Sequence, residues 1–439
     1  MSLPLRRLFF YLILIIFIIS APLVILYTAG FRYNFKQNKV LRTGAIILSS
    51  NPTGAAVFLN NRQRRETTPA RLLNVTPGEY NVSLAKDGFY SWQKRLAAES
   101  NQVTFGNNVI LFKKSEPVEI SSGEIVDFIL DPRGKTLFFI KKDGNLYEIW
   151  RQEANGETIL TWRSTFTQTP KLLEWLADDA LLIKSEEYYL LNIKTNAQTI
   201  KSIDKITGRP WEKIGVVKNH NFLLGLSGND LYSINPLSGT TDLLEHQVTD
   251  FYPYGNKFIF LQKNEKGEAS LKESEWTSVR EIVRLPSVDF EFREAPPPWL
   301  ALYDRTNKKM VLLSENDGSK QYTINGDGLC WLNADAPALL SRSSFEIWNN
   351  LPKNNPGDLI TRVSEEITNM FCHPSRNAFI IATNNSIKAL ELDTRDQQNI
   401  YLLTKIEKIR ETIMDKDGAN IYFTGTKNQG QGLWRLQIK

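Results

Sequence analysis

From Asp131 to the C-terminus, the sequence repeats one pattern: a polar turn, an apolar run rich in strand-forming residues, a second turn and a second apolar run. The first unit opens at Asp131-Pro132-Arg133-Gly134 and the last opens at Asp415-Lys416-Asp417-Gly418. Seven steps of about 40 residues separate these openings, which is the period of a four-stranded propeller blade. One such sheet cannot bury both of its faces, whereas blades that stack around an axis can. The repeat therefore favours an all-β structure with a β-propeller over residues 117–439.

The number of blades depends on how the ring closes. The chain ends about three strands into its last unit, and the segment Val118-Glu119-Ile120 is the candidate for the missing outer strand. This closure predicts eight blades, and seven remain if the weak fifth unit near Trp299 belongs to its neighbour. The Asp-Pro-x-Gly and Gly-x-Leu-Tyr patterns of the first unit resemble TolB-like propellers, while the Gly-His and Trp-Asp dipeptides of WD repeats are absent. A long solenoid and two β-sandwiches are the alternative architectures.

The residues from Leu8 to Gly30 are nearly all apolar and uncharged. This length suits a helix that crosses about 30 Å of hydrocarbon, and Pro22 is tolerated within such a helix. A cleavable signal peptide is the competing interpretation, since Arg6 and Arg7 resemble its basic start. Its apolar stretch, however, runs to only about 7–15 residues. We therefore predict a transmembrane helix at 8–30.

Charge at both ends of this segment leaves the membrane orientation open. We favour a cytoplasmic tail at residues 1–7, with a basic linker at 31–43 and everything beyond it outside the cytoplasm. A short tail stays inside easily, and a long downstream domain can be translocated.

Short alternating strands follow at residues 44–113, punctuated by turn residues. The ordered set of turn and core positions here resembles the PEGA domain family. The matching residues include Pro52, Gly54, Ala55, Thr68, Pro69, Pro77, Gly78, Tyr80, Gly88 and Trp92. Thr53 replaces the usual Glu of the namesake motif, and Phe89 replaces a common Tyr. The resemblance implies a small extracytoplasmic β-sandwich of about five strands near a membrane, without catalytic residues.

Basic residues gather next to the apolar segment. Residues 31–115 contain thirteen lysines and arginines against four aspartates and glutamates, and the rest of the chain from Glu116 is net acidic. Such a cluster attracts anionic lipid headgroups or an anionic polymer. The candidate contact residues are Arg32, Lys36, Lys39, Arg42, Arg62, Arg64 and Arg65. A solvated basic surface is the alternative for all of them, and we expect Trp92 to pack in the core.

The sequence contains no motif for a serine nucleophile, a phosphate-binding loop or a zinc protease. Two of the three histidines, His220 and His373, fall at equivalent turns, so repetition explains them better than a metal site. Asp415-x-Asp417-Gly418 is interpreted as a hairpin turn rather than a calcium loop. Cys330 and Cys372 lie about one repeat apart, where either a disulfide or two buried free thiols is compatible with the sequence; free thiols are the default expectation.

Adjacent acidic residues, such as Glu186-Glu187 and Glu365-Glu366, are expected to point to opposite faces of a strand and not to act together. No catalytic, cofactor or metal site is predicted, and no nucleic-acid partner is expected. The sequence favours a membrane-anchored, extracytoplasmic binding or scaffolding protein of the cell envelope, with a protein or a cell-wall or surface polysaccharide as partner. An enzyme that acts on envelope polysaccharide at the propeller mouth and the ectodomain of a signalling complex are the alternatives.

Overall fold

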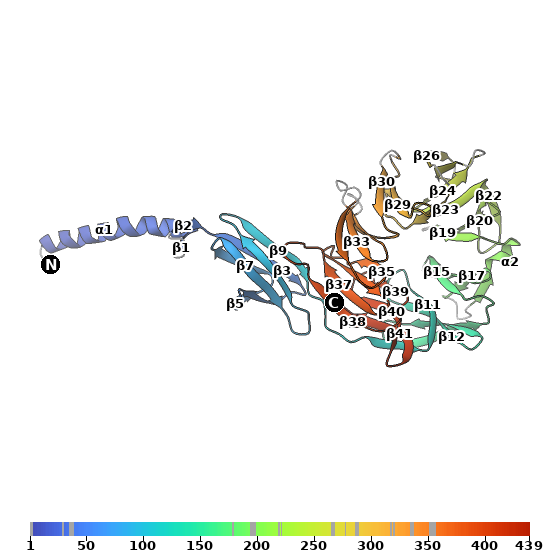
Figure 1. Cartoon of the computed structure of the whole chain (residues 1–439), viewed down its shortest axis with the longest axis horizontal. Coiled ribbons are helices and arrows are strands. Elements are labelled where there is room, and N and C mark those ends of the chain that lie inside the picture. Colours follow the sequence, from blue (N-terminus) through green and yellow to red (C-terminus); the bar gives the residue numbers. More distant parts are fainter. Residues whose placement is uncertain are drawn as a thin grey trace.

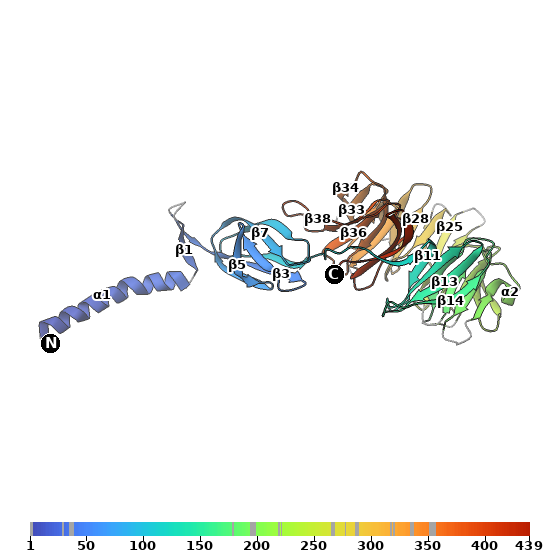
Figure 2. The same ribbon diagram turned by 90° about the horizontal axis from the view of Figure 1, so that it is seen from below.

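The computed structural model shows an N-terminal helix, a small β-domain and a ring of sheets that follow one another along the long axis (Figures 1 and 2). It describes residues 3–439 apart from positions 29, 35–38, 178–179, 194–198, 218–219, 221, 265–267, 277, 286–288, 317, 319–320, 334–337 and 351–356. Lys36 and the turn residues at 178–179, 218–219 and 334–335, which belong to the sequence repeat, lie outside the described residues.

The first element is helix α1 (Leu3–Thr28), which contains Pro22. It begins five residues before the predicted span of 8–30 and ends two residues before the end of that span. Its stretch Leu8–Thr28 is long and apolar enough to cross a membrane, by length and composition, and is not buried against the rest of the chain. The predicted basic linker at residues 31–43 contains regular structure. Strands β1 (Phe31–Asn34) and β2 (Lys39–Arg42) pair there as an antiparallel hairpin.

The small domain is a sandwich of two sheets, with seven strands where about five were expected. One sheet has the order β6 (Ala70–Val75), β3 (Gly44–Asn51), β9 (Val103–Ile110), and β3 and β9 run parallel. The other has the order β5 (Arg62–Thr67), β4 (Ala56–Leu59), β7 (Gly78–Ala85), β8 (Trp92–Ala98). Alternate side chains of both sheets, among them Ile46, Leu48 and Trp92, form one buried core between them.

Beyond the sandwich, the described residues form eight four-stranded antiparallel sheets, arranged as a ring (Figure 1). Seven of these blades are continuous in sequence. The first blade comprises β11 (Glu124–Leu130), β12 (Leu137–Asp143), β13 (Leu146–Gln152) and β14 (Thr158–Ser164), the second β15 (Lys171–Leu176), β16 (Ala180–Lys184), β17 (Tyr188–Asn192) and β18 (Thr199–Ser202), and the third β19 (Lys213–Val216), β20 (Leu223–Ser227), β21 (Asp230–Ile234) and β22 (Thr241–Glu245). The fourth comprises β23 (Val248–Tyr254), β24 (Lys257–Lys263), β25 (Ala269–Ser274) and β26 (Val279–Leu285), and the fifth β27 (Phe290–Arg293), β28 (Trp299–Asp304), β29 (Lys309–Ser314) and β30 (Gln321–Asn325). The sixth comprises β31 (Gly328–Asn333), β32 (Ala338–Arg342), β33 (Glu346–Asn350) and β34 (Asp358–Arg362), and the seventh β35 (Ile367–Cys372), β36 (Ala378–Thr383), β37 (Ser386–Glu391) and β38 (Ile400–Lys405). A short helix, α2 (Ile203–Thr207), links the second and third blades.

The eighth blade closes the ring by joining the two ends of the propeller. Its inner strands are β39 (Thr412–Met414), β40 (Asn420–Lys427) and β41 (Gly430–Gln437), and its outer strand is β10 (Val118–Ser122). Val118 pairs with Arg435, and Glu119 pairs with Trp434. The predicted closure by the segment at Val118 is therefore confirmed. The weak fifth unit forms its own sheet, β27–β30, so the ring has eight blades rather than seven.

The first strand of each blade lies toward the axis of the ring. Strands β11, β15, β19 and β23 each contact the first strand of the next blade, and β31 contacts β35 in the same way. Apolar clusters fill the spaces between neighbouring blades; Ile140, Leu181 and Ile183, for example, join the first two. Each blade therefore buries apolar side chains against its neighbours, which an isolated four-stranded sheet could not do.

One covalent bond also joins two blades. Cys330 on β31 and Cys372, the last residue of β35, form a disulfide with a Cα–Cα distance of 5.4 Å. The expectation of free thiols is therefore wrong. Because the first strands of adjacent blades run side by side near the axis, two cysteines that are 42 residues apart in sequence meet there.

Candidate functional site at the domain interface and the propeller axis

The motif residues of the small domain hold its turns and its core. The hydroxyl of Thr68 accepts a hydrogen bond of 2.9 Å from the backbone N–H of Ala55 and contacts the Ser50 hydroxyl at 2.6 Å. Gly54 and Gly88 adopt positive φ values of 78° and 80°, which glycine accepts without strain. The remaining motif positions lie in or beside these strands and turns: Pro52, Pro69, Pro77, Gly78 and Tyr80.

The six basic candidates that the structure describes fall into two separate groups. Arg32 and Arg42 belong to the β1–β2 hairpin, where the Arg32 guanidinium lies 3.6 Å from the ring centre of Tyr27, at the end of α1. Lys39 is also in that hairpin. The other group, Arg62, Arg64 and Arg65, lies on β5, an exposed edge strand of the sandwich. Contact of either group with lipid or polymer stays a prediction.

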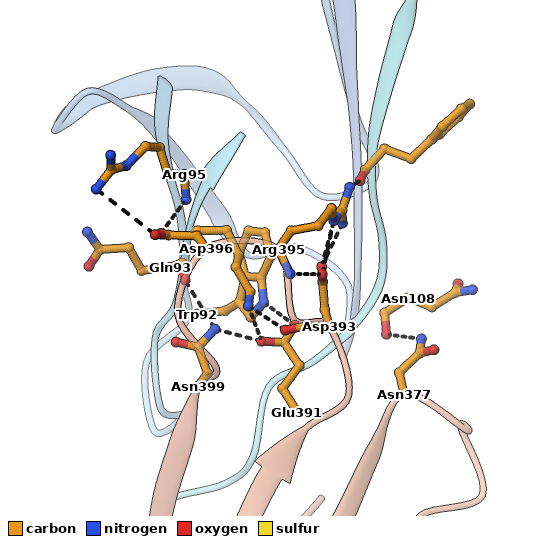
Figure 3. Close-up of polar contacts among 12 residues, drawn as sticks. Trp92, Gln93, Arg95, Asn108, Asn377, Glu391, Asp393, Arg395, Asp396 and Asn399 are labelled. Atoms are coloured by element: carbon orange, nitrogen blue, oxygen red, sulfur yellow. Dashed lines mark hydrogen bonds and ion pairs between the residues drawn. The ribbon is translucent and has the colours of Figure 1, made fainter. Parts of the chain in front are cut away.

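The sandwich is joined to the seventh blade by a dense polar interface (Figure 3). The indole N–H of Trp92 donates a hydrogen bond of 2.7 Å to Oε1 of Glu391, at the end of β37. The side-chain amide of Asn399 donates to Oε2 of Glu391 at 2.7 Å and to the backbone carbonyl of Gln93 at 3.1 Å. Trp92 is therefore both a core residue of the sandwich, with 1% of its surface exposed, and a contact to the propeller.

Lys94 is the most unusual member of this interface, because it is fully buried. Its ammonium group donates to the backbone carbonyls of Asp393 (2.6 Å) and Gln397 (2.7 Å) and lies 3.4 Å from the Glu391 carboxylate. A buried cation is tolerated only when it is paired and hydrogen-bonded in this way. The loop between β37 and β38 is thus wrapped around a lysine of the sandwich.

The same loop reaches back to the sandwich through Arg395. Its guanidinium forms a bidentate pair with the carboxylate of Asp393, through Nε to Oδ1 and Nη2 to Oδ2, and donates to the backbone carbonyl of Phe105 at 2.8 Å. The backbone N–H of Arg95 donates to Asp396 at 3.0 Å, and Asn377 donates to the carbonyl of Asn108 at 2.9 Å. This interface is not predictable from the sequence, because no local pattern marks these polar residues as partners.

An apolar contact completes the junction. Phe112, just after the sandwich, is 1% exposed and packs against Tyr401 of β38, with ring centres 5.6 Å apart. It belongs to the same buried cluster as residues of the seventh and eighth blades, including Ile380 and Ile421. The hydroxyl of Tyr90 donates to the carbonyl of Leu402 at 2.6 Å. Polar and apolar contacts together hold the sandwich to the ring.

The propeller axis carries a second group of polar side chains. Asp127 on β11 accepts backbone hydrogen bonds from Phe128 (2.8 Å) and from Leu172 of the next blade (2.7 Å). Burial of its carboxyl group raises the pKa of Asp127 to about 7, and the nearby negative charge of Glu411 is the second cause of this increase. Glu411 immediately precedes β39, so this carboxyl pair sits where the first and eighth blades meet.

Equivalent positions make similar bridges in other blades. Asp250 binds the ammonium of Lys213 of the preceding blade at 2.6 Å, and Asn369 donates to the carbonyl of Thr412 in the following one at 3.1 Å. Each of these two residues comes directly after a shift in strand register within the first strand of its blade. The recurrence indicates that the primary role of these side chains is to tie neighbouring blades together.

The histidines do not meet. His220 and His373 occupy equivalent turns between the first and second strands of their blades, as the repeat predicts, and His246 pairs with Asp230 at 2.9 Å. Burial lowers the pKa of His373, whose Nε2–H donates to the Gly418 carbonyl. Within the described ranges, no group of three or more His, Cys, Asp or Glu side chains is arranged for a metal ion.

The remaining acidic candidates stabilise local turns. The Asp415 carboxylate accepts backbone N–H bonds from Ala419 (2.7 Å) and Asn420 (3.0 Å), as in a hairpin turn. Glu186 and Glu187 lie in a turn and not on a strand. The expectation that they point to opposite faces of a strand is therefore wrong. Their partners nonetheless differ, being the Tyr189 hydroxyl for the first and the Ser202 hydroxyl for the second.

The second acidic pair is also in a turn. Glu365 accepts a hydrogen bond of 2.5 Å from the Thr383 hydroxyl, and Glu366 accepts one of 3.2 Å from the Ser344 hydroxyl. These two carboxylates therefore have different partners as well, although they do not lie on opposite faces of a strand.

Comparison with known proteins agrees with this architecture. The PEGA domain model matches residues 43–109. No curated protein matches the sequence. Among solved structures, the Dos1 propeller is similar with a TM-score of 0.50 at 11% identity, covering 75% of this chain and 96% of that one. A eukaryotic initiation factor is similar with a TM-score of 0.50 at 11% identity, covering 74% and 88%. At such identities the likeness concerns the fold alone. The chain thus combines an apolar N-terminal helix, a PEGA domain and a β-propeller.

Proposed function

We propose that this chain is a membrane-anchored, extracytoplasmic binding or scaffolding protein of the cell envelope. Helix α1 anchors it, the PEGA domain stands next to the membrane, and the propeller presents its surface to a protein or a surface polysaccharide. The PEGA resemblance supports this location, since such modules are associated with envelope proteins.

The observation that carries the proposal is the disulfide between Cys330 and Cys372. Disulfides persist in oxidising compartments, whereas thiol-reducing systems of the cytosol keep cysteines reduced. These two are the only cysteines in the chain, and they are paired. Such a bond supports a location of the propeller outside the cytoplasm, with the N-terminal end of α1 inside.

The rigid junction between the PEGA domain and the seventh blade supports a scaffolding role. The buried Lys94 and the Trp92–Glu391 hydrogen bond fix the orientation of the ring relative to the domain that leads to the anchor. A binding surface held in one orientation loses less freedom when a partner binds than one on a flexible tether.

Protease treatment of intact and permeabilised cells, followed through an epitope after Lys439, tests the location. Cleavage in intact cells is expected. Protection until permeabilisation would place the propeller in the cytoplasm and overturn the proposal. The mass of the mature chain provides a separate test of the anchor, because signal-peptide cleavage would remove α1 and release the protein from the membrane fraction.

An enzyme at the propeller axis is the second candidate, and the carboxyl pair of Asp127 and Glu411 favours it. Carboxyl groups with raised pKa values serve as general acids in glycoside hydrolysis. Two features count against it. Glycosidase carboxyls stand about 5–9.5 Å apart, whereas this pair interacts by a direct hydrogen bond, and Asp127 is already bound to two backbone amides. Polysaccharide cleavage that disappears in both Asp127→Asn and Glu411→Gln variants would make this candidate the better one.

A further inference from the structure

Four arginines stand together on one side of the PEGA domain, which we call the arginine side. Arg62, Arg64 and Arg65 are on β5, Arg71 is on β6, and all four are exposed. The two strands contain one acidic residue, Glu66. Among the described residues, none forms an ion pair or a hydrogen bond with any of the four guanidinium groups. The arginine side therefore carries positive charge that the chain itself does not neutralise.

The arginine side lies opposite the propeller. Strands β5 and β8 are the two edges of one sheet of the sandwich, and β6 and β9 are the two edges of the other. The propeller is bound by β8 and β9, for example through Lys94 and the carbonyl of Phe105. Strands β5 and β6 contact each other at the opposite edge, and both views show β5 on the side toward α1 (Figures 1 and 2). The ring therefore leaves the arginine side uncovered.

The β1–β2 hairpin brings the sandwich back to the end of α1. Both the backbone N–H and the hydroxyl of Thr43 donate hydrogen bonds of 2.9 Å to the carbonyl of Gly30, just after α1 ends at Thr28. The sandwich begins at the next residue, Gly44. It therefore starts where the apolar helix ends, and no long spacer holds it away from a membrane that α1 crosses.

An exposed apolar side chain lies at this same end of the sandwich. Leu73 on β6 has 66% of its surface exposed. Its neighbour Leu72 pairs with Ile46, close to the start of β3, so Leu73 lies near Thr43 and the end of α1. Surfaces that combine basic groups with exposed apolar side chains bind the headgroup region of bilayers, where both kinds of group are accommodated. An anionic polymer offers charge but no apolar layer, so these observations favour a bilayer.

We infer that the arginine side, together with Leu73, docks on the bilayer that α1 spans and binds the phosphate groups of anionic lipid headgroups. The inference rests on the proposed membrane anchor and deepens it by naming the partner of the PEGA domain. Arginine suits phosphate, because its planar guanidinium can donate two parallel hydrogen bonds to it. The anchor keeps the surface at a high effective concentration near the lipid, so individually weak contacts suffice. Docking would also fix the tilt of the propeller, which is joined to the sandwich through Lys94.

Energy transfer in lipid nanodiscs tests this docking on the full-length protein. A fluorophore is attached at Gln63→Cys, an exposed position between the arginines, and the lipid carries a headgroup-linked acceptor. The added thiol is the one available for labelling, because Cys330 and Cys372 are bonded to each other. Discs of phosphatidylcholine are compared with discs of equal parts phosphatidylcholine and phosphatidylglycerol. We expect higher energy transfer in the anionic discs and loss of this difference at high salt, which screens exposed charges.

Charge variants in the labelled protein identify the residues responsible. Combined replacement of the four arginines should abolish the difference between the two kinds of disc and leave the unfolding temperature unchanged, since their side chains are exposed and unpaired: Arg62→Gln, Arg64→Gln, Arg65→Gln and Arg71→Gln. The matched control removes the same charge from exposed propeller positions and should retain the difference: Lys171→Gln, Lys201→Gln, Lys309→Gln and Lys405→Gln. Leu73→Ser should reduce the difference in part.

Equal energy transfer in the two kinds of disc, or a difference that persists without the four arginines, would overturn the inference. Arginine-dependent binding of soluble poly(glycerol phosphate), with no difference between the discs, would assign the arginine side to an anionic polymer and would overturn it as well. Protease accessibility in cells tests the proposed location of the propeller separately, so either idea can fail while the other stands.

Discussion

The indole nitrogen of Trp92 lies 2.7 Å from Oε1 of Glu391, a residue 299 positions further along the chain. Trp92 is a motif residue of the PEGA domain, and Glu391 ends the third strand of the seventh blade. This hydrogen bond links the core of the small domain to the ring, alongside the buried Lys94 and the packing of Phe112.

Trp92→Phe should weaken the junction. The substitution keeps an aromatic ring in the core but removes the N–H that Glu391 accepts, and a hydrogen bond to a charged group contributes about 1.5–3 kcal/mol. We expect a decrease of that size in the free energy of unfolding in urea, with faster hydrogen exchange in the loop at 392–399. Trp162→Phe, in a partly buried position of the first blade, controls for the smaller ring. Equal effects of the two changes on loop exchange would argue against the link.

Lys94→Met should be more damaging. The change leaves the carbonyls of Asp393 and Gln397 and the carboxylate of Glu391 without their cation. Removal of one partner from a buried pair costs about 3–5 kcal/mol. Lys86→Met is the matched control, since the Lys86 ammonium makes an exposed hydrogen bond to Thr53, and its effect on unfolding should be within about 1 kcal/mol. A Lys94→Met protein as stable as the control would show that the ammonium does not hold the loop.

Reduction of the disulfide should lower the stability of the propeller. The bond closes a loop of 42 residues, for which chain entropy predicts about 4 kcal/mol. We expect a lower unfolding temperature in the presence of a phosphine reductant. The double variant Cys330→Ala, Cys372→Ala should unfold at a similarly low temperature whether or not reductant is present. A reductant effect that persists in the double variant would have another origin.

The carboxyl pair at the propeller seam predicts a pH dependence. Because burial and Glu411 raise the pKa of Asp127 to about 7, the folded state holds a proton there that the unfolded chain loses near pH 4. The resulting stabilisation is fully present below about pH 4 and is lost as the pH rises toward 7. Asp127→Asn should therefore flatten this part of the stability–pH curve.

The control for that experiment is Asp250→Asn. Asp250 occupies the equivalent position but contacts the Lys213 ammonium instead of a carboxyl group. Its replacement should lower stability and leave the decline between about pH 4 and 7 in place. A wild-type curve without that decline would show that Asp127 is ionised in the folded protein throughout this range.

Much of the architecture follows from local patterns in the sequence. The apolar stretch from Leu8 indicates a helix long enough to span a membrane, because helix rise fixes the number of residues required. The recurring turns, such as Asp131-Pro132-Arg133-Gly134, mark each blade between its first two strands. The three-stranded last unit and the early strand at Val118 together predict the closure of the ring. Turn chemistry and strand alternation act over a few residues, so they are readable without a structure.

The contacts between distant segments were decided by the tertiary structure alone. Lys94 is one of many basic residues in its region, and only docking against the loop after Glu391 buries it. Cys330 meets Cys372 because the first strands of two consecutive blades lie side by side, and Asp127 meets Glu411 because ring closure brings the first and eighth blades together. Burial and charge pairing depend on which surfaces face each other in space. A periodic sequence specifies that blades form, but which polar side chains meet across a seam is set by the geometry of the closed ring.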